Sequence, residues 1–180
     1  MQPRIPRQSA GEQDPRPPAG TDADDRFGPE LAPVVTGARR RAVRDGDRQI
    51  DTAHLLHSLL EHDADARAVL GDGPRIARLL GYLVQRSIGY GLRWQSAVED
   101  SGAVPVVPGA AGFSPLAAAA MEDAGERAAR RGRDRAGGLD LLAALVADPQ
   151  ARAVEVLARA AIEPRAVLAG VTEHQGTSSR

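Results

Sequence analysis

The sequence predicts an all-α protein built from two copies of one four-helix repeat. Three observations support this fold class. Apolar residues recur at helical spacing through most of the chain after residue 26. Proline and glycine mark the boundaries between these periodic segments. The second half of the chain also repeats the first, so each half is expected to form one unit that buries its apolar face against the other.

The first helix is expected to start around Pro33 and to end near Gly46. Proline is tolerated in the first turn of a helix, where its missing N–H has no intrahelical partner. The residues that share one face of this helix are all apolar, namely Leu31, Val34, Val35, Ala38 and Ala42.

The second helix is expected to follow Asp51 and Thr52, which are good N-cap residues. Four leucines cover one of its sides. The opposite side is expected to face solvent, and it carries His54, His57, Ser58 and Glu61. A short helix over 64–70 and a longer one from Pro74 complete the first repeat.

The repeat becomes visible when the segment from Phe27 is placed over the segment from Phe113, an offset of 86 residues that needs no gap. Identical residues then coincide along both helices and the turn between them. The matched pairs are Phe27 with Phe113, Pro29 with Pro115, Ala38 with Ala124, Arg41 with Arg127, Ala42 with Ala128, Gly46 with Gly132, Leu55 with Leu141 and Leu56 with Leu142.

Composition divides the chain into an ordered part and two ends. The first 26 residues are rich in Pro, Gly, Asp, Gln and Arg, and they cannot bury enough apolar surface to offset the entropy of ordering. We therefore predict a disordered arm (1–26), a domain over 27–175 made of repeat 1 (27–100), a linker (101–112) and repeat 2 (113–175), and a disordered tail (176–180).

The residue inventory excludes several kinds of chemistry. The chain has no cysteine, which excludes disulfides and thiolate metal sites and suits a reducing compartment, so we expect a cytoplasmic location. It has no lysine, which excludes a P-loop, and we therefore expect no ATP binding. No apolar run is long enough to cross a membrane.

At these residues the chain resembles the Clp N-terminal domain, the tandem repeat at the start of Clp-type AAA+ unfoldases. The resemblance covers about residues 27–173. It is carried by the opening FGPELAP with GARRRA, the turn RDGDRQ, the segment IDTAHLLHSLL and the closing LARAAIEPRAVL at 157–168. It implies a pseudo-twofold bundle of eight helices that recruits adaptors or substrates and has no catalysis or cofactor of its own.

The sequence departs from the family pattern in two respects. Seven residues follow the region of resemblance, so we expect the protein to act by binding, without an attached ATPase ring. In family members that recognise phosphoarginine, the Glu of a Gly-Thr-Glu-His motif contacts the guanidinium group. Ala53 and Leu139 occupy these positions here, so phosphoarginine binding is not carried over. The family His is retained as His54.

The residues proposed to line a ligand or partner groove are Phe27, Phe113, Arg39, Arg127 and His54. The resemblance suggests a peptide groove near the starts of the two matching helices that begin at the phenylalanines. The same phenylalanines could instead be staples that fix the entry of the chain into each helix. The sequence does not choose between these roles.

Neither a metal site nor a hydrolase active site is predicted from the residues of the second helix. The spacing of His54, His57 and Glu61 could direct three ligands to one metal, but a solvated helix face explains it more simply, and no metal site is predicted. Ser58 has histidine neighbours but no nucleophile elbow, so no hydrolase is predicted.

The arginine runs at 39–41 and 127–135 could bind phosphate, yet acidic residues are interleaved with them and the net charge is −1. We therefore predict a non-catalytic module that binds proteins or peptides. Its expected partners are a Clp unfoldase, adaptor or client proteins, or peptide-like small molecules, and its expected role is as an accessory or competitor in Clp-dependent proteolysis. The alternative is a helical regulatory protein that binds nucleic acid through its arginine clusters.

Overall fold

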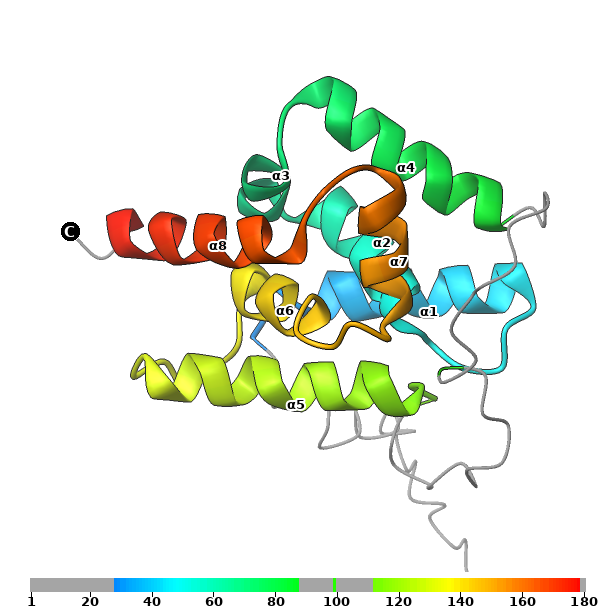
Figure 1. Cartoon of the computed structure of the whole chain (residues 1–180). Coiled ribbons are helices and arrows are strands. Elements are labelled where there is room, and N and C mark those ends of the chain that lie inside the picture. Colours follow the sequence, from blue (N-terminus) through cyan, green and yellow to red (C-terminus); the bar gives the residue numbers. More distant parts are fainter. Residues whose placement is uncertain (1–27, 88–98, 100–111, 179–180) are drawn as a thin grey trace, which may run out of the picture.

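The computed structural model describes residues 28–87, 99 and 112–178, and within these ranges it is all-helical (Figure 1). The four helices of the first repeat are α1 (Ala32–Asp45), α2 (Thr52–His62), α3 (Ala64–Leu70) and α4 (Gly73–Ser87). The four of the second are α5 (Pro115–Arg130), α6 (Gly138–Leu145), α7 (Arg152–Arg159) and α8 (Pro164–Ser178). The predicted fold class, two four-helix repeats, is confirmed.

The repeats end their first helices in the same way. Gly46 after α1 and Gly132 after α5 both adopt left-handed backbone conformations, with φ of 75° and 71°. In each case the following N–H donates back to a carbonyl of the last turn, from Asp47 to Ala42 and from Arg133 to Ala128, both at 2.9 Å. This geometry needs a residue without a Cβ, which explains why glycine stands at both positions.

Helix α2 is buried on all sides, and this corrects the prediction that one of its faces is solvated. His54 and His57 are each 6% exposed and Ser58 is 0% exposed. The physical reason is that α2 is central: it packs against α1 and α3 of its own repeat and also against α5, α6 and α7 of the other. A solvated face therefore exists only at the C-terminal end of α2, where Glu61 and His62 are exposed.

The two repeats are interlocked, and they are related by an approximate twofold exchange. Helix α3 packs on α8 of the other repeat, and α4 packs on α7, which is the same pair of contacts with the repeats exchanged. In the same way, α2 packs on α7 and α6 on α3. Figure 1 shows α4 and α5 on opposite sides of the bundle, with α6 and α7 between them. The two repeats therefore share one core.

A short contact between two segments of the chain holds the repeats together. Ile50, just before α2, forms a parallel β-bridge with Phe113, just before α5. The backbone N–H of Ile50 donates to the carbonyl of Gly112 at 2.6 Å, and that of Ser114 donates to the carbonyl of Ile50 at 2.9 Å. The start of the second repeat is thereby tied to the turn that precedes α2.

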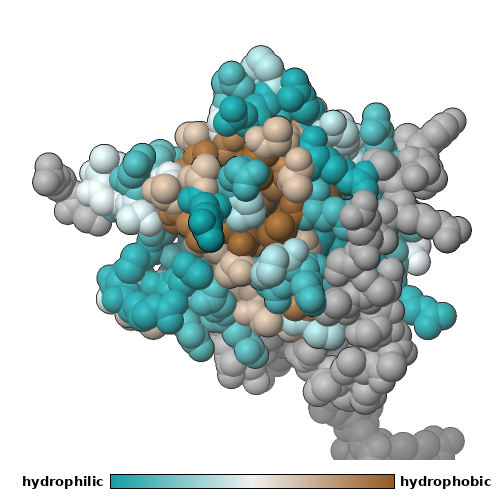
Figure 2. Space-filling view, viewed as in Figure 1, coloured by the Kyte–Doolittle hydropathy of each residue, from teal (hydrophilic) through white to brown (hydrophobic). Residues whose placement is uncertain are grey.

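The core consists mainly of leucines and alanines from both repeats, with valines and isoleucines among them. The predicted stripe on α1 is buried, with Val35 the most exposed of its residues at 5%. Several half-buried apolar side chains pack onto the core from outside, among them Leu80 on α4, Val154 on α7 and Leu168 on α8. Figure 2 shows an apolar area in the middle of one face, where α7 and the start of α8 lie, surrounded by polar residues.

Some of the predicted boundaries fall outside the described residues. The arm predicted over 1–26 and most of the linker over 101–112 lie there, as does Phe27. Helix α8 continues to Ser178, three residues past the predicted end of the domain at residue 175. Among the described helices, none is both long and apolar enough to cross a membrane.

Candidate functional site at the junction of the repeats

The residues proposed from the sequence to line a groove lie at separate places. Phe113 is half-buried against the core, and His54 is buried at the start of α2. Arg39 is exposed on α1, whereas Arg127 is half-buried on α5 and pairs with an aspartate of the same helix at 2.8 Å. No hydrogen bond or ion pair within the described ranges joins any two of these four. The groove itself remains a prediction.

A hydrogen-bonded polar site at the junction is centred on a buried carboxylate that sequence reasoning missed. Glu99 is 3% exposed and accepts four hydrogen bonds. Its Oε1 accepts from the backbone N–H of Thr52 at 3.0 Å and from the hydroxyl of Ser114 at 2.9 Å. Its Oε2 accepts from the hydroxyl of Thr52 and from the backbone N–H of Arg152, both at 2.8 Å.

These four donors belong to the starts of three helices from both repeats. Thr52 begins α2, Arg152 begins α7, and Ser114 is the N-cap of α5, whose hydroxyl also accepts from the N–H of Ala117 at 3.1 Å. The first N–H groups of a helix have no intrahelical partner and carry partial positive charge, so an anion is stabilised there. The carboxylate of Glu99 therefore bonds both repeats at once.

A buried ion pair crosses the junction beside Glu99. The guanidinium of Arg152 lies 2.6 Å from Oδ2 of Asp51, and both side chains are 4% exposed. A further link runs from the backbone N–H of Ala153 to the hydroxyl of Thr52 at 3.0 Å. Burial opposes ionisation of Asp51, but hydrogen bonds from His54 and Arg152 outweigh this effect and lower its pKa to about 2.

His54 lies among three carboxylates at the start of α2. Its Nε2 is 3.3 Å from Asp47 and 3.6 Å from Asp45. Its Nδ1 lies 2.9 Å from Oδ1 of Asp51 and 3.1 Å from the backbone nitrogen of the same residue. Burial disfavours the charged imidazolium, but Asp47 and Asp51 more than offset this and raise the pKa of His54 to about 9.

The residues that could hold a metal cation near His54 differ from those considered from the sequence. The trio weighed from the sequence, His54, His57 and Glu61, is not gathered around one point. Instead, ligand atoms of Asp47, Asp51 and His54 lie within 4.8 Å of one another. Asp51 already forms an ion pair with Arg152, and its carboxylate caps α2 by accepting from the N–H of His54 at 2.8 Å. A helix cap therefore explains this cluster without a metal ion.

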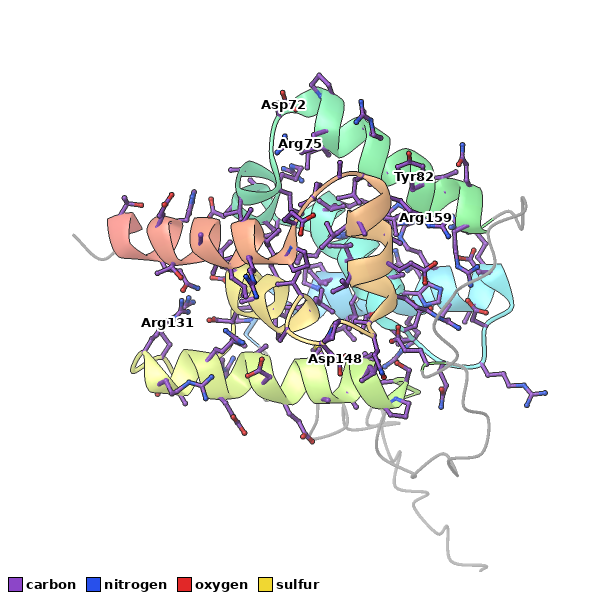
Figure 3. All side chains as sticks on the ribbon, viewed as in Figure 1. Asp72, Arg75, Tyr82, Arg131, Asp148 and Arg159 are labelled. Atoms are coloured by element: carbon purple, nitrogen blue, oxygen red, sulfur yellow. The ribbon has the colours of Figure 1, made fainter. Side chains whose placement is uncertain are left out.

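The start of α6 in the second repeat corresponds to the start of α2 in the first, but different side chains surround it. A cavity of about 410 Å³ lies at the start of α6, and Gly137, Gly138, Asp63 and Arg131 are among the residues that line it. Arg131 pairs with the buried Asp140 at 2.6 Å, and Figure 3 shows it in the region between α5 and α8. A Cβ on Gly138 would lie 1.8 Å from a carboxylate oxygen of Asp63, so glycine is required for this close approach.

The positions that carry the family glutamates hold apolar side chains. Ala53 is 5% exposed and Leu139 is half-buried against the core. Neither side chain offers a charge partner to a guanidinium.

Ser58, which the sequence offered as a candidate nucleophile, is fully buried between α1 and α2, where a substrate does not reach it.

Comparisons with known proteins identify the fold. A scan of protein-family models and a search of curated proteins find no match. Among solved structures, the N-terminal domain of the caseinolytic protease associated chaperone ClpD from Arabidopsis thaliana is 21% identical, with a TM-score of 0.64, and the match covers 84% of this chain and 96% of that one. A chain from a structural study of a malarial protein secretion system is 14% identical, with a TM-score of 0.58 over 82% of this chain and 93% of that one.

The fold likeness agrees with the all-helical architecture, since the match to the ClpD domain covers 84% of this chain. The resemblance of the sequence to the Clp repeat and the similarity of the structure thus lead independently to the same fold. The chain has a Clp N-terminal-like fold.

Proposed function

We propose that this chain is a non-catalytic module that binds proteins or peptides and acts as an accessory or competitor in Clp-dependent proteolysis. The observation that supports the proposal is the match to the ClpD N-terminal domain, which covers 96% of that domain. The helices that build both junctions are present in this chain, so it has a full-length scaffold on which to present a binding surface.

The residues favour binding over catalysis. The polar groups at the junction are engaged with one another: Glu99 accepts four hydrogen bonds, and Arg152 is paired with Asp51. The histidine with the raised pKa is surrounded by carboxylates and is 6% exposed. These groups stabilise the fold, and a partner would be recognised by the exposed surface around them.

Reconstituted degradation tests the proposal. The full chain is added to a Clp unfoldase and its peptidase from the source organism while they degrade a fluorescent client, and the degradation rate is measured against the concentration of the added chain. An accessory raises the rate for a subset of clients, whereas a competitor lowers it in a saturable way. Phe113→Ala serves as a comparison, provided that its melting temperature shows that it folds.

Affinity capture of the same partners supplies a second readout. Enrichment of the unfoldase or its adaptors on the immobilised full chain, confirmed by direct binding of the purified partner, supports the proposal. An unchanged degradation rate together with no direct binding contradicts it. Steeply salt-dependent binding of DNA or RNA would favour the nucleic-acid alternative instead.

A further inference from the structure

The outer faces of the two matching helices α1 and α5 carry different charge. Helix α1 contains four arginines, and its single acidic residue is Asp45 at its last position. Helix α5 carries Glu122, Asp123 and Glu126 in addition to its arginines. In the sequence alignment of the two repeats, Asp123 matches Gly37 and Glu126 matches Arg40. The second repeat is thus charge-balanced where the first is basic.

A cavity of about 440 Å³ opens on the basic side of α1, between this helix and the C-terminal end of α2. Arg40, Arg41 and Arg44 line it from α1, and Glu61 and His62 line it from α2. A volume of this size holds several side-chain-sized groups. The cavity is far from the junction described above, because it lies at the opposite end of α2 from Thr52.

Arg41 lines this cavity, and one of its N–H groups lacks a hydrogen-bond partner among the described residues. Its side chain is 13% exposed and forms an ion pair with Glu61. Its Nε is buried and has no hydrogen-bond partner among the described residues. Burial opposes ionisation of Glu61, but Arg41 outweighs it and lowers the pKa of that carboxyl. A guanidinium presents several N–H donors in a plane, so Arg41 can bond a second oxyanion beside Glu61.

The rim adds further positive charge. Arg40 is exposed and makes no hydrogen bond or ion pair with a described residue. Arg44 lies one turn further on; its side chain is 58% exposed and its Nε lies 3.1 Å from Oδ1 of Asp45. Exposed arginines that converge on a cavity recognise carboxylate or phosphate oxygens more readily than lysines would, because of their fork geometry. The matching surface of repeat 2 lacks this arrangement, since Asp123 pairs with Arg127 there.

We propose that the α1–α2 cavity binds the carboxylate side chains of an acidic peptide segment, with Arg40 and Arg41 as the anion-binding residues and Glu61 as an internal competitor. The proposal rests on the proposed function as a peptide-binding module and names the chemistry of its ligand. A nucleic acid fits less well because its regularly spaced phosphates need basic charge along an extended surface, whereas these arginines converge on one cavity and the net charge of the chain is −1.

Fluorescence anisotropy with two labelled peptides tests this site on the full chain. One peptide carries four glutamates spaced by glycine and serine, and the other has glutamine at the same places. Arg40→Glu, which introduces the residue found in repeat 2, should weaken binding of the glutamate peptide by about tenfold or more. Arg78→Glu on α4 changes the net charge equally at an exposed site, and it should leave the affinity within about twofold.

The competitor role of Glu61 gives a prediction of the opposite sign. Glu61→Gln removes the resident carboxylate and should tighten binding of the glutamate peptide by about threefold or more. Binding should also raise the pKa of His57, which burial, Arg41 and Arg44 lower to about 4, with Glu61 and Asp45 acting in the opposite direction. An NMR titration of the His57 ring with and without the peptide measures this shift.

Several outcomes would overturn the inference. Equal loss of affinity in Arg40→Glu and Arg78→Glu would mean diffuse attraction and no site, and so would equal binding of the glutamine peptide. Complete displacement of the peptide by inorganic phosphate at equal concentration would mean a site for small anions. Tighter binding of single-stranded nucleic acid than of the peptide would assign the arginines to that ligand. If Clp partners still bind while the glutamate peptide does not, this inference fails and the proposed function stands.

Discussion

Ala161, directly after α7, adopts a left-handed backbone conformation with φ of 56°. The N–H of Ile162 donates to the carbonyl of Leu157 at 2.9 Å, so Ala161 terminates the helix at a place where glycine is usual. A left-handed conformation costs a residue with a Cβ about 1–2 kcal/mol.

We therefore expect Ala161→Gly to stabilise the protein by about 1 kcal/mol, less the entropy that glycine loses on folding. Urea denaturation followed by circular dichroism measures the change. Ala119→Gly, at an exposed position inside α5, is the control and should destabilise by about 0.5–1 kcal/mol. Destabilisation by both changes would show that the turn after α7 has no strain to relieve.

Glu99 is the residue whose single replacement should reveal the junction most clearly. In Glu99→Gln one acceptor oxygen becomes an NH₂ group, which must face donors of Thr52 or Arg152 whichever way the amide turns. Unpaired buried donors cost about 1–3 kcal/mol each, so we expect a loss of stability of that order. Glu155→Gln, in a half-buried i,i+4 pair on α7, should cost less than about 1 kcal/mol. Equal losses in both variants would argue against a special role for Glu99.

The two buried histidines predict a stability maximum near pH 6.5. The pKa of His54 is raised to about 9, so its contribution is complete below about pH 6.5 and is lost as the pH rises through 9. The pKa of His57 is lowered to about 4, so its contribution is complete above about pH 6.5 and is lost as the pH falls through 4. Denaturant titrations at pH values from 4 to 9 give the free energy of unfolding as a function of pH and test the fall on the acid side and on the alkaline side. His54→Gln should reduce the loss of stability on the alkaline side, and His57→Gln should reduce the loss on the acid side. If neither substitution changes the dependence of stability on pH, the two histidines do not cause it.

At the scale of elements, the close packing of α1 on α2 depends on Gly37. A Cβ there would lie 2.2 Å from the hydroxyl of the buried Ser58 but 3.4 Å from its Cβ. Gly37→Ala should therefore destabilise by about 1–3 kcal/mol, even though alanine is the better helix former. Ser58→Ala in the same chain should recover most of this loss, as measured by thermal melting of the double variant. Repeat 2 has Ala144 at the position of Ser58. No recovery would mean that the helices themselves must separate.

Sequence patterns predicted the individual helices well because each boundary has a local cause. Gly46 and Gly132 end their helices by backbone conformation, and Asp51 caps α2 through its own side chain. The burial of His54, His57 and Ser58 was not predictable in this way. Periodicity reports one apolar stripe, whereas the second covered face of α2 is polar and packs against α1 of the same repeat.

At the scale of the molecule, the shared core predicts a single unfolding transition. Leu56 and its counterpart Leu142 are both 0% exposed, and aspartate at either place would bury an unpaired charge. Leu56→Asp should therefore unfold both repeats together, with a loss of more than about 4 kcal/mol. Calorimetry and circular dichroism would detect this as the loss of all cooperative melting. Two separate transitions would show that the repeats are independent domains.

The junction site could not be predicted because it depends on how the repeats meet. Glu99 lies in a stretch without helical periodicity, and its donors Thr52, Ser114 and Arg152 are up to 53 residues away in sequence. The family resemblance anticipated the overall arrangement, including the eight helices. It did not anticipate a carboxylate from between the repeats at the helix starts, since the motif positions themselves hold Ala53 and Leu139.

The exchange of helix contacts between the repeats also governs when this protein can fold during its synthesis. Helices α3 and α4 obtain their partners from α8 and α7, which are synthesised after the whole first repeat. A nascent chain that has completed only the first repeat still exposes the leucines of α2 and α4 to solvent, and such surfaces are prone to aggregate. We therefore expect the emerging first repeat to need shielding until α7 and α8 have been synthesised.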